Sequence, residues 1–285
     1  MAVARDLFDS PDLWFAALTC PRDDDEWGEH NVTTHPIVAL PLSPVWQVHD
    51  GGPRTLMTPN SAVFHHDGGE YHRERFLDRS YRCLFFFPSE RLVRRIVAEA
   101  DERAAGADAF RFPLRTVPVG GRILTMARRL AGGLASGGGR DGDAERVFEV
   151  LRLTVLSAFP SRRPRPGTRP STIRARTELV EGAKAMMASR FGDPMPLEEI
   201  AGALHVSPYH LARVFRAETG YSVHGYLTNL RVREGLVRLA DGAGSDIAAL
   251  GADLGFSSHS HFTAAFRGAM GVVPSAVEPS TFSTA

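Results

Sequence analysis

Two stretches of this chain, "HLARVFRAETG" at residues 210–220 and "HFTAAFRGAMG" at residues 261–271, share histidine, phenylalanine, arginine and glycine at matching positions. Each follows a shorter apolar segment, "PLEEIAGALHV" at 196–206 and "SDIAALGADLG" at 245–255. Glycine commonly ends a helix because it adopts the left-handed backbone conformation without strain. The sequence therefore predicts two copies of a helix-turn-helix unit, and the second copy has one extra residue in its turn.

The segment between the copies is long enough to act as a rigid spacer. Residues 224–241, "HGYLTNLRVREGLVRLAD", predict a helix of about 27 Å at about 1.5 Å per residue. Helices that read successive major grooves on one face of a DNA duplex lie about 34 Å apart, which is one turn of DNA. We therefore expect the spacer to let a single chain contact two adjacent groove segments.

Residues 173–285 resemble the DNA-binding region of the AraC/XylS family of transcriptional regulators. The resemblance is carried by "SPYHLARVFRAETGYS", "YLTNLRVREGLVRL" and "LGADLGFSSHSHFTAAFRGAMGVVPS", and by the spacing between these segments. It implies a sequence-specific DNA-binding transcriptional regulator. It also implies that the first half of the chain is a cupin-like sensing and dimerisation domain, which binds a small-molecule effector.

The residues expected to contact DNA lie on the two recognition helices and on the spacer. Arg213 is the leading candidate for base recognition, because a guanidinium group can donate to both O6 and N7 of guanine. Ala264 stands where many relatives carry an arginine, so we expect the second helix to position the protein more than it reads bases. The full set of candidates is Ser207, Pro208, Tyr209, His210, Ala212, Arg213, Arg216, Arg231, His259, Ser260, Thr263 and Arg267.

Length and composition indicate a globular protein of about two domains. The chain has 285 residues, of which 43% are hydrophobic and 23% charged. We expect a first domain at 1–160, an Arg/Pro-rich linker at 161–172 and the DNA-binding domain at 173–285. The first residues do not resemble a signal peptide and no apolar run is long enough to span a bilayer, so we expect a cytoplasmic protein without a membrane partner.

The charge balance is unusual for a protein that binds nucleic acid. The formal net charge is zero, and Lys184 is the only lysine among 33 basic residues. Since DNA-binding domains usually carry a basic excess, we expect the linker arginines and a homodimer to supply further phosphate contacts. The partners expected are double-stranded DNA, RNA polymerase, a second copy of the chain and an unidentified small effector.

The first domain has the pattern of a β-rich unit followed by helices, which gives an α+β fold class with a cupin-like β-barrel before an all-α domain. Short β-branched and aromatic runs alternate with Gly, Pro, Asp and Asn clusters. Apolar residues then recur at three- and four-residue steps. The predicted strands are "HPIVALP", "VWQVH", "SAVFHH", "RCLFFFP" and "FRFPLRTVPV", and the predicted helices are "SERLVRRIVAEADE", "GRILTMARRLAGGLA" and "DAERVFEVLRLTVLSAF".

The histidines and the predicted sheet of the first domain raise the question of a metal site and of an effector site. Residues 64–72, "FHHDGGEYH", lack the spacing of a cupin metal site, so we interpret them as a hairpin with partly exposed histidines around the turn at 67–69. We expect no metal and no cofactor. The effector would contact residues of the sheet cavity, for which the candidates are His49, Tyr71, His72 and Arg82.

Two alternatives to an effector-controlled regulator remain open from the sequence. In one, the protein binds DNA constitutively and its first domain only dimerises. In the other, a cupin-type metalloenzyme is fused to a DNA-binding domain. The chain contains no nucleophile elbow, phosphate-binding loop or paired acid and base, so we expect no enzymatic activity.

Overall fold

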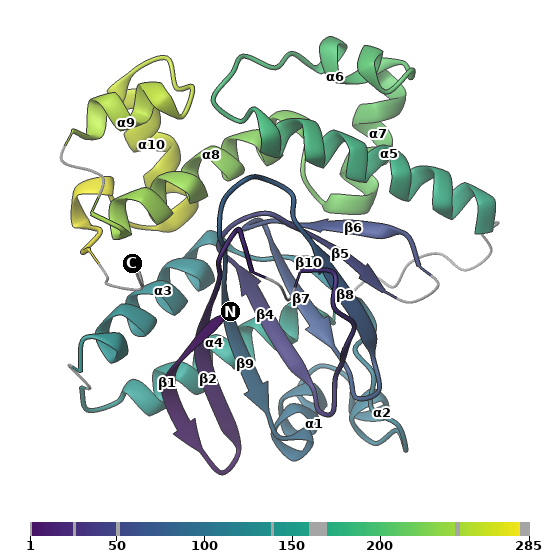
Figure 1. Ribbon diagram of the computed structural model, residues 1–285, viewed down its shortest axis with the longest axis vertical. Coiled ribbons are helices and arrows are strands. Elements are labelled where there is room, and N and C mark those ends of the chain that lie inside the picture. Colours follow the sequence, from purple (N-terminus) through teal and green to yellow (C-terminus); the bar gives the residue numbers. More distant parts are fainter. Residues whose placement is uncertain are drawn as a thin grey trace.

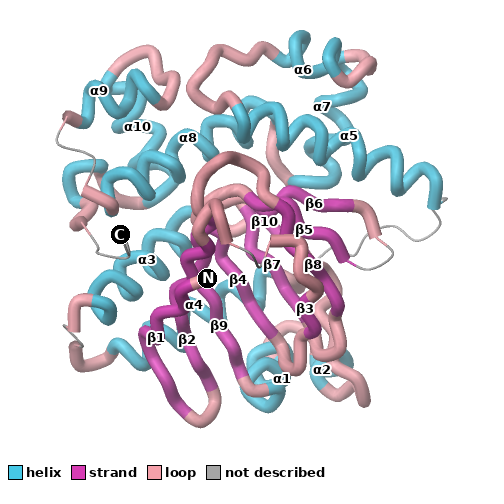
Figure 2. Tube along the Cα trace, viewed as in Figure 1, coloured by secondary structure: helices cyan, strands magenta, loops and turns pink. Residues whose placement is uncertain are grey.

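The computed structural model describes residues 2–24, 27–49, 52–137, 140–159, 170–242 and 246–279. A sheet-rich N-terminal part is followed by a helical C-terminal part, as the sequence predicted (Figure 1, Figure 2). In the described part of the chain, no helix is both long and apolar enough to cross a membrane. Residues 161–169, most of the predicted linker, lie outside the described residues.

The N-terminal strands form two separate sheets. The larger sheet has the order β1 (Val3–Ser10), β2 (Leu13–Cys20), β9 (Tyr81–Pro88), β4 (Ile37–Pro41), β7 (Ser61–His65) and β10 (Thr116–Pro118). The smaller sheet has the order β3 (Asn31–Val32), β8 (Glu70–Glu74), β5 (Val45–His49) and β6 (Arg54–Met57). Since no strand pairing joins the two sheets among the described strands, the predicted barrel is not closed.

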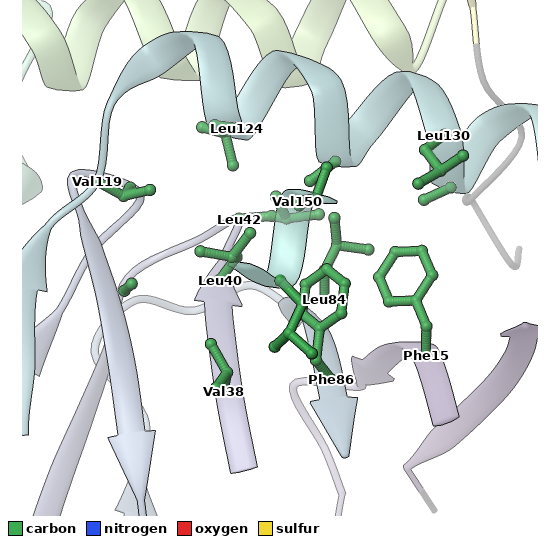
Figure 3. Packing of buried hydrophobic residues seen from close by; sticks show 14 of the residues in the cluster. Phe15, Val38, Leu40, Leu42, Leu84, Phe86, Val119, Leu124, Leu130 and Val150 are labelled. Carbon is green, nitrogen blue, oxygen red and sulfur yellow. The ribbon is translucent and has the colours of Figure 1, made fainter. Parts of the chain in front are cut away.

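The larger sheet is buried on both faces because apolar residues occupy both phases of its central strands. Along β9, Cys83 and Phe85 pack between the two sheets, whereas Leu84 and Phe86 face the helices. Strand β4 alternates in the same way. Figure 3 shows the helix-facing side chains of these strands meeting Leu124 and Val150. A strand that reads as a continuous apolar run is therefore a two-sided core strand here.

The described N-terminal part also has four helices, α1 (Glu90–Ala98) and α2 (Glu102–Ala105) before β10, and α3 (Gly121–Ala135) and α4 (Asp143–Ser157) after it. Ser89 caps α1 as expected, since its side chain accepts a hydrogen bond from the Leu92 amide. Helices α3 and α4 have the bounds that the periodicity predicted to within a few residues. They cover one face of the larger sheet.

Three expectations for the strands need correction. Strands β1, β2, β3 and β6 were not anticipated, and the predicted strand at 110–119 is a strand only over Thr116–Pro118. The predicted hairpin at 64–72 is wrong, because β7 and β8 belong to different sheets. Its turn leads the chain from one sheet to the other, and the Thr33 hydroxyl holds it by donating to the His66 carbonyl at 2.6 Å.

The described C-terminal part contains six helices: α5 (Pro170–Ser189), α6 (Leu197–Ala203), α7 (Pro208–Thr219), α8 (Val223–Ala240), α9 (Ile247–Asp253) and α10 (His259–Met270). A short 3-10 turn, η1 (Pro274–Ala276), comes after them. Ser207 and Ser258 cap α7 and α10 by accepting amide hydrogen bonds, and Gly220 and Gly271 end these helices at positive φ. The two units are thus built alike.

The turns of the two units have different residues at one equivalent position with a left-handed backbone. His205 and Gly255 both adopt left-handed backbone angles, with φ of 55° and 78°. A side chain on Gly255 would collide with the Gly192 carbonyl and with the guanidinium group of Arg231. Glycine is therefore required in the second turn by space as well as by conformation.

The two parts of the chain share one core rather than meeting at a loose joint. One continuous cluster joins residues of the larger sheet and α3 to Leu236 of α8 and Phe262 of α10. At the middle of α8, the buried Arg233 donates hydrogen bonds to the main-chain carbonyls of Pro59 and Val119. The helical part is therefore docked rigidly on the sheets.

Glycine in α9 allows the second unit to pack closely, which two matched substitutions test. A Cβ on Gly251 would lie 3.0 Å from Phe262 Cβ, whereas a Cβ on Gly202 in α6 would meet no described atom within 4 Å. We expect Gly251→Ala to lower the free energy of unfolding by about 1–3 kcal/mol through overpacking. Gly202→Ala should raise it by up to about 1 kcal/mol, because alanine favours a helix.

Urea unfolding of the full chain measures both variants. Equal effects of Gly251→Ala and Gly202→Ala would contradict the close approach of α9 and α10.

Candidate nucleic-acid interface

Helix α7 presents an exposed polar face. Tyr209 is 79% exposed, and His210, Arg213 and Arg216 are also exposed. Leu211, Val214 and Phe215 on the other face are buried against α5, α6 and α8. Pro208 and Ala212 are half-buried at the border, and Ser207 is held as the cap. The structure therefore brings the predicted residues of the first unit together on one accessible face.

Both recognition helices point their N-terminal ends away from the sheets. At the C-terminal end of α7, a Cβ on Gly220 would lie 3.7 Å from Pro118. At the C-terminal end of α10, Met270 Sδ accepts a hydrogen bond from the Thr125 hydroxyl at 3.5 Å. Each helix has 12 residues and is about 18 Å long, so its first turn lies well outside this contact. Helix-turn-helix proteins insert that first turn into the major groove.

Figure 1 shows how the two units are spaced. Helices α6 and α7 lie at one end of α8, and α9 and α10 lie at its other end. Helix α8 has 18 residues, the length predicted for the spacer, and begins one residue earlier than expected, which gives a length of about 27 Å. This arrangement separates the recognition helices along a single rod.

The second unit exposes fewer of its predicted residues. His259 and Ser260 are exposed in the first turn of α10, and Arg267 is exposed near its C-terminal end. Thr263 is only half-buried as a residue, but its hydroxyl oxygen is buried without a hydrogen-bond partner in the described structure. Thr263 was expected to be exposed for contact with DNA, and the structure instead makes it less accessible than His259 and Ser260.

The prediction that Arg231 contacts DNA is also corrected, because its guanidinium group makes hydrogen bonds within the fold. It donates to the carbonyls of Phe191 at 2.6 Å, Asp193 at 2.8 Å and Gly255 at 2.9 Å. Burial lowers the pKa of Arg231, and the Asp193 carboxylate opposes this shift. Arg231 thus joins the turn of the second unit to the end of α5 and is withdrawn from the proposed phosphate contacts.

In the N-terminal part, two of the four predicted effector residues lie together between the sheets. The ring centroids of His49 and Tyr71 are 6.1 Å apart, and His65, which the sequence analysis did not select, lies 4.4 Å from Tyr71. Arg115 donates to His49 Nδ1 at 2.7 Å, and Gln47 lies 3.3 Å from His65 Nε2. Polar side chains of both sheets therefore converge at this point.

The other two predicted effector residues lie elsewhere. His72 follows Tyr71 in β8 and so points to the opposite face, where its Nε2 lies 3.3 Å from Glu74. Arg82 alternates with Tyr81 in β9 and points away from the space between the sheets. Its guanidinium group donates to Asp241 at 2.7 Å. These two placements correct the predicted effector set, because neither side chain faces the sheet cavity.

The ionic contacts between the two parts were missed in the sequence. Besides Arg82, Arg128 of α3 lies 3.7 Å from Asp241 at the end of α8. Glu234 of α8 forms an ion pair with Arg79 at 3.3 Å. The sequence did contain a signal for these contacts, which was the pair of charged residues Arg233 and Glu234 within the apolar face of the spacer. Buried charges require partners, so this pair indicated ionic contacts with another part of the chain.

The family model matches the C-terminal part of the chain. Residues 200–278 match the family of the helix-turn-helix domain. The chain is 27% identical over 128 residues to the uncharacterized HTH-type transcriptional regulator YfiF of Bacillus subtilis, covering 45% of this chain and 40% of that protein. It is 32% identical over 94 residues to the regulatory protein PchR of Pseudomonas aeruginosa, covering 33% of this chain and 32% of PchR.

The chain thus spans less than half the length of these curated relatives. Among solved structures, it is similar to an AraC-type transcriptional regulator from Chromobacterium violaceum, with 26% identity, a TM-score of 0.33, and coverage of 34% of this chain and 87% of the other. The family match and the named relatives confirm the AraC/XylS resemblance of the helix-turn-helix region.

The exposed face of α7 gives a direct test of base recognition. We expect Arg213→Ala to lower the affinity of the full chain for its DNA site about 10- to 100-fold, which corresponds to about 1–3 kcal/mol. The base preference at one position of the site should relax as well. Arg146→Ala, an arginine of α4 paired with Asp143, removes the same charge far from this face.

Fluorescence anisotropy with a site and its single-base variants measures this effect. An equal loss of affinity in Arg213→Ala and Arg146→Ala would show that only net charge matters.

His65 gives the fold a pH dependence. Burial, together with the positive charges of His49, Arg115, Arg73 and His66, lowers the pKa of His65 to about 3. Because the unfolded chain binds a proton near pH 6.5 and the folded chain does not, stability falls as the pH drops from about 6.5 toward 3. The slope due to this residue is about 1.4 kcal/mol per pH unit at most.

Chemical unfolding of the wild-type chain and of His65→Gln between pH 7 and pH 4.5 checks this expectation. His65→Gln should show a shallower loss, and His35→Gln, which changes an exposed histidine, should follow the wild type. Parallel curves for His65→Gln and the wild type would refute a neutral buried His65.

Proposed function

We propose that the full chain is a transcriptional regulator that binds double-stranded DNA sequence-specifically, because residues 200–278 match a helix-turn-helix domain family and resemble the AraC/XylS regulators. The observation that carries this proposal is the common outward orientation of the first turns of α7 and α10 on one docked helical part. The domains proposed are a sensing and dimerisation domain at 1–160, a linker at 161–172 and the DNA-binding domain at 173–285.

Within this proposal the two units have different tasks. The first unit supplies base recognition through Tyr209 and Arg213, which are two of its exposed long side chains. The second unit supplies position through His259, Ser260 and Arg267. Phosphate contacts of this kind fix the register of a protein on the duplex without reading its sequence.

The N-terminal part is proposed to dimerise and to bind a small effector, which together control the DNA-binding domain. A homodimer doubles the phosphate contacts, which offsets the absence of a basic excess in the chain. RNA polymerase is the proposed partner through which the bound regulator acts. No catalytic role is proposed.

The rigid spacer predicts a strict spacing between the two halves of the DNA site. Once a site is selected from random DNA, inserting five base pairs between the halves turns the second half to the opposite face of the duplex. We expect such an insertion to weaken binding by at least about tenfold. Because α8 cannot lengthen, a ten-base-pair insertion should not restore the affinity.

Gel-shift titration with the full chain measures these affinities, and a salt series accompanies it. Affinity should fall as salt rises, in proportion to the number of phosphates contacted. A salt-independent affinity, or equal binding to all spacings, would contradict simultaneous contact by both units.

A further inference from the structure

A cavity of about 150 Å³ lies where the sheets meet the first helix-turn-helix unit. Its wall on one side comes from β6, from the turn before β7 and from β10, and on the other side from α5, the end of α7 and the start of α8. A cavity of this volume can hold a molecule about the size of benzene. Any occupant would contact both parts of the chain and the helix that positions α7.

The only lysine of the chain, Lys184, lines this cavity. It is 8% exposed, and its ammonium group donates to Glu181 Oε1 at 2.8 Å. An ammonium group carries three donors, but this is the one hydrogen bond that Lys184 makes within the described residues. A buried charge whose donors are left unfilled is costly, so an acceptor from outside the protein fits here.

The ammonium group of Lys184 is charged at neutral pH. Burial opposes the charge, but the Glu181 carboxylate and Tyr226 outweigh burial and raise the pKa of Lys184. Glu181 itself has little left to offer a ligand, since its Oε2 already accepts the Leu56 amide at 2.6 Å. The pair Lys184 and Glu181 is therefore neutral in sum and presents donors to the cavity.

Two hydrogen-bond acceptors in the cavity wall favour a positively charged group on the ligand. Asn60 is buried and donates through Nδ2 to the Tyr226 carbonyl at 3.1 Å, while its Oδ1 has no hydrogen-bond partner in the described structure. Glu218 also lines the cavity and is exposed at its rim. An anion would meet two carboxylates and one ammonium group, whereas a cation would leave the donors of Lys184 unfilled. A molecule that carries both charges satisfies both sides.

We propose that this cavity binds a small zwitterion of the α-amino acid class, with its carboxylate on Lys184 and its ammonium group toward Asn60 and Glu218. The ligand bridges the sheets and the first helix-turn-helix unit and thereby stabilises the docked arrangement of α7. Its regulatory role rests on the proposed function, whereas its binding is measured without DNA and stands or falls separately.

The test is a ligand screen on the full chain in the absence of DNA. The probes are the twenty common amino acids, with acetate, methylamine and glycerol as anionic, cationic and neutral controls. We expect at least one small amino acid to raise Tm by several degrees at about 100 times its Kd. Isothermal titration calorimetry then gives the affinity.

Two variants locate the ligand. The double variant Glu181→Gln with Lys184→Met removes both buried charges and keeps an acceptor for the Leu56 amide, and it should abolish binding. Thr177→Trp places a large side chain at the cavity wall without removing a buried charge, and it should lower the affinity at least tenfold. Ile173→Trp, an exposed position of the same helix outside the cavity, should bind like the wild type.

Failure of every amino acid to shift Tm, or stronger binding of acetate, methylamine or glycerol, overturns the ligand class. Unchanged binding in both cavity variants overturns the location. If amino acids bind but the chain shows no affinity for DNA, the cavity proposal survives and the proposed function fails.

Discussion

The docking of Arg233 is the constraint on which the arrangement of this protein depends. Its guanidinium group lies 1% exposed in the middle of α8 and donates to carbonyls of the turn before β7 and of the chain after β10. Burial lowers the pKa of Arg233 to about 10, so the side chain remains charged at neutral pH. Pulling α8 from the sheets would remove these acceptors from a buried charge, which is costly. The spacer helix is therefore held at its centre.

Docking at the centre of the spacer fixes both of its ends. Glu234 and Asp241 add ionic contacts to Arg79 and Arg82, and Tyr226 bonds to Thr58 at 2.7 Å near the other end. Since α7 and α10 pack on opposite ends of α8, the sheets determine the relative position of the two recognition helices. Ordering these helices before binding reduces the entropy lost when both contact DNA.

The sequence predicted the helical part well because its signals are local. Serine caps, glycine ends and the apolar repeat of α7 and α10 are each set by neighbours within one or two turns. The β-rich part was less predictable. Its strands pair with partners far along the chain. The corner at residues 66–69 could not be distinguished from a hairpin, because both need the same turn residues.

The site residues were likewise predictable where local signals decide their exposure and unpredictable where long-range contacts do. Exposure of Tyr209 and Arg213 follows from helical periodicity, whereas the roles of Arg231 and Arg82 depend on contacts with segments 24 to 159 residues away. An arginine on a predicted surface can equally reach a phosphate or a carbonyl of its own chain. Among the arginines predicted to contact DNA, the half-buried Arg231 bonds to carbonyls of its own chain, whereas Arg213 and Arg216 are exposed on α7. Burial therefore separates Arg231 from the candidates on α7, and only the fold reveals it.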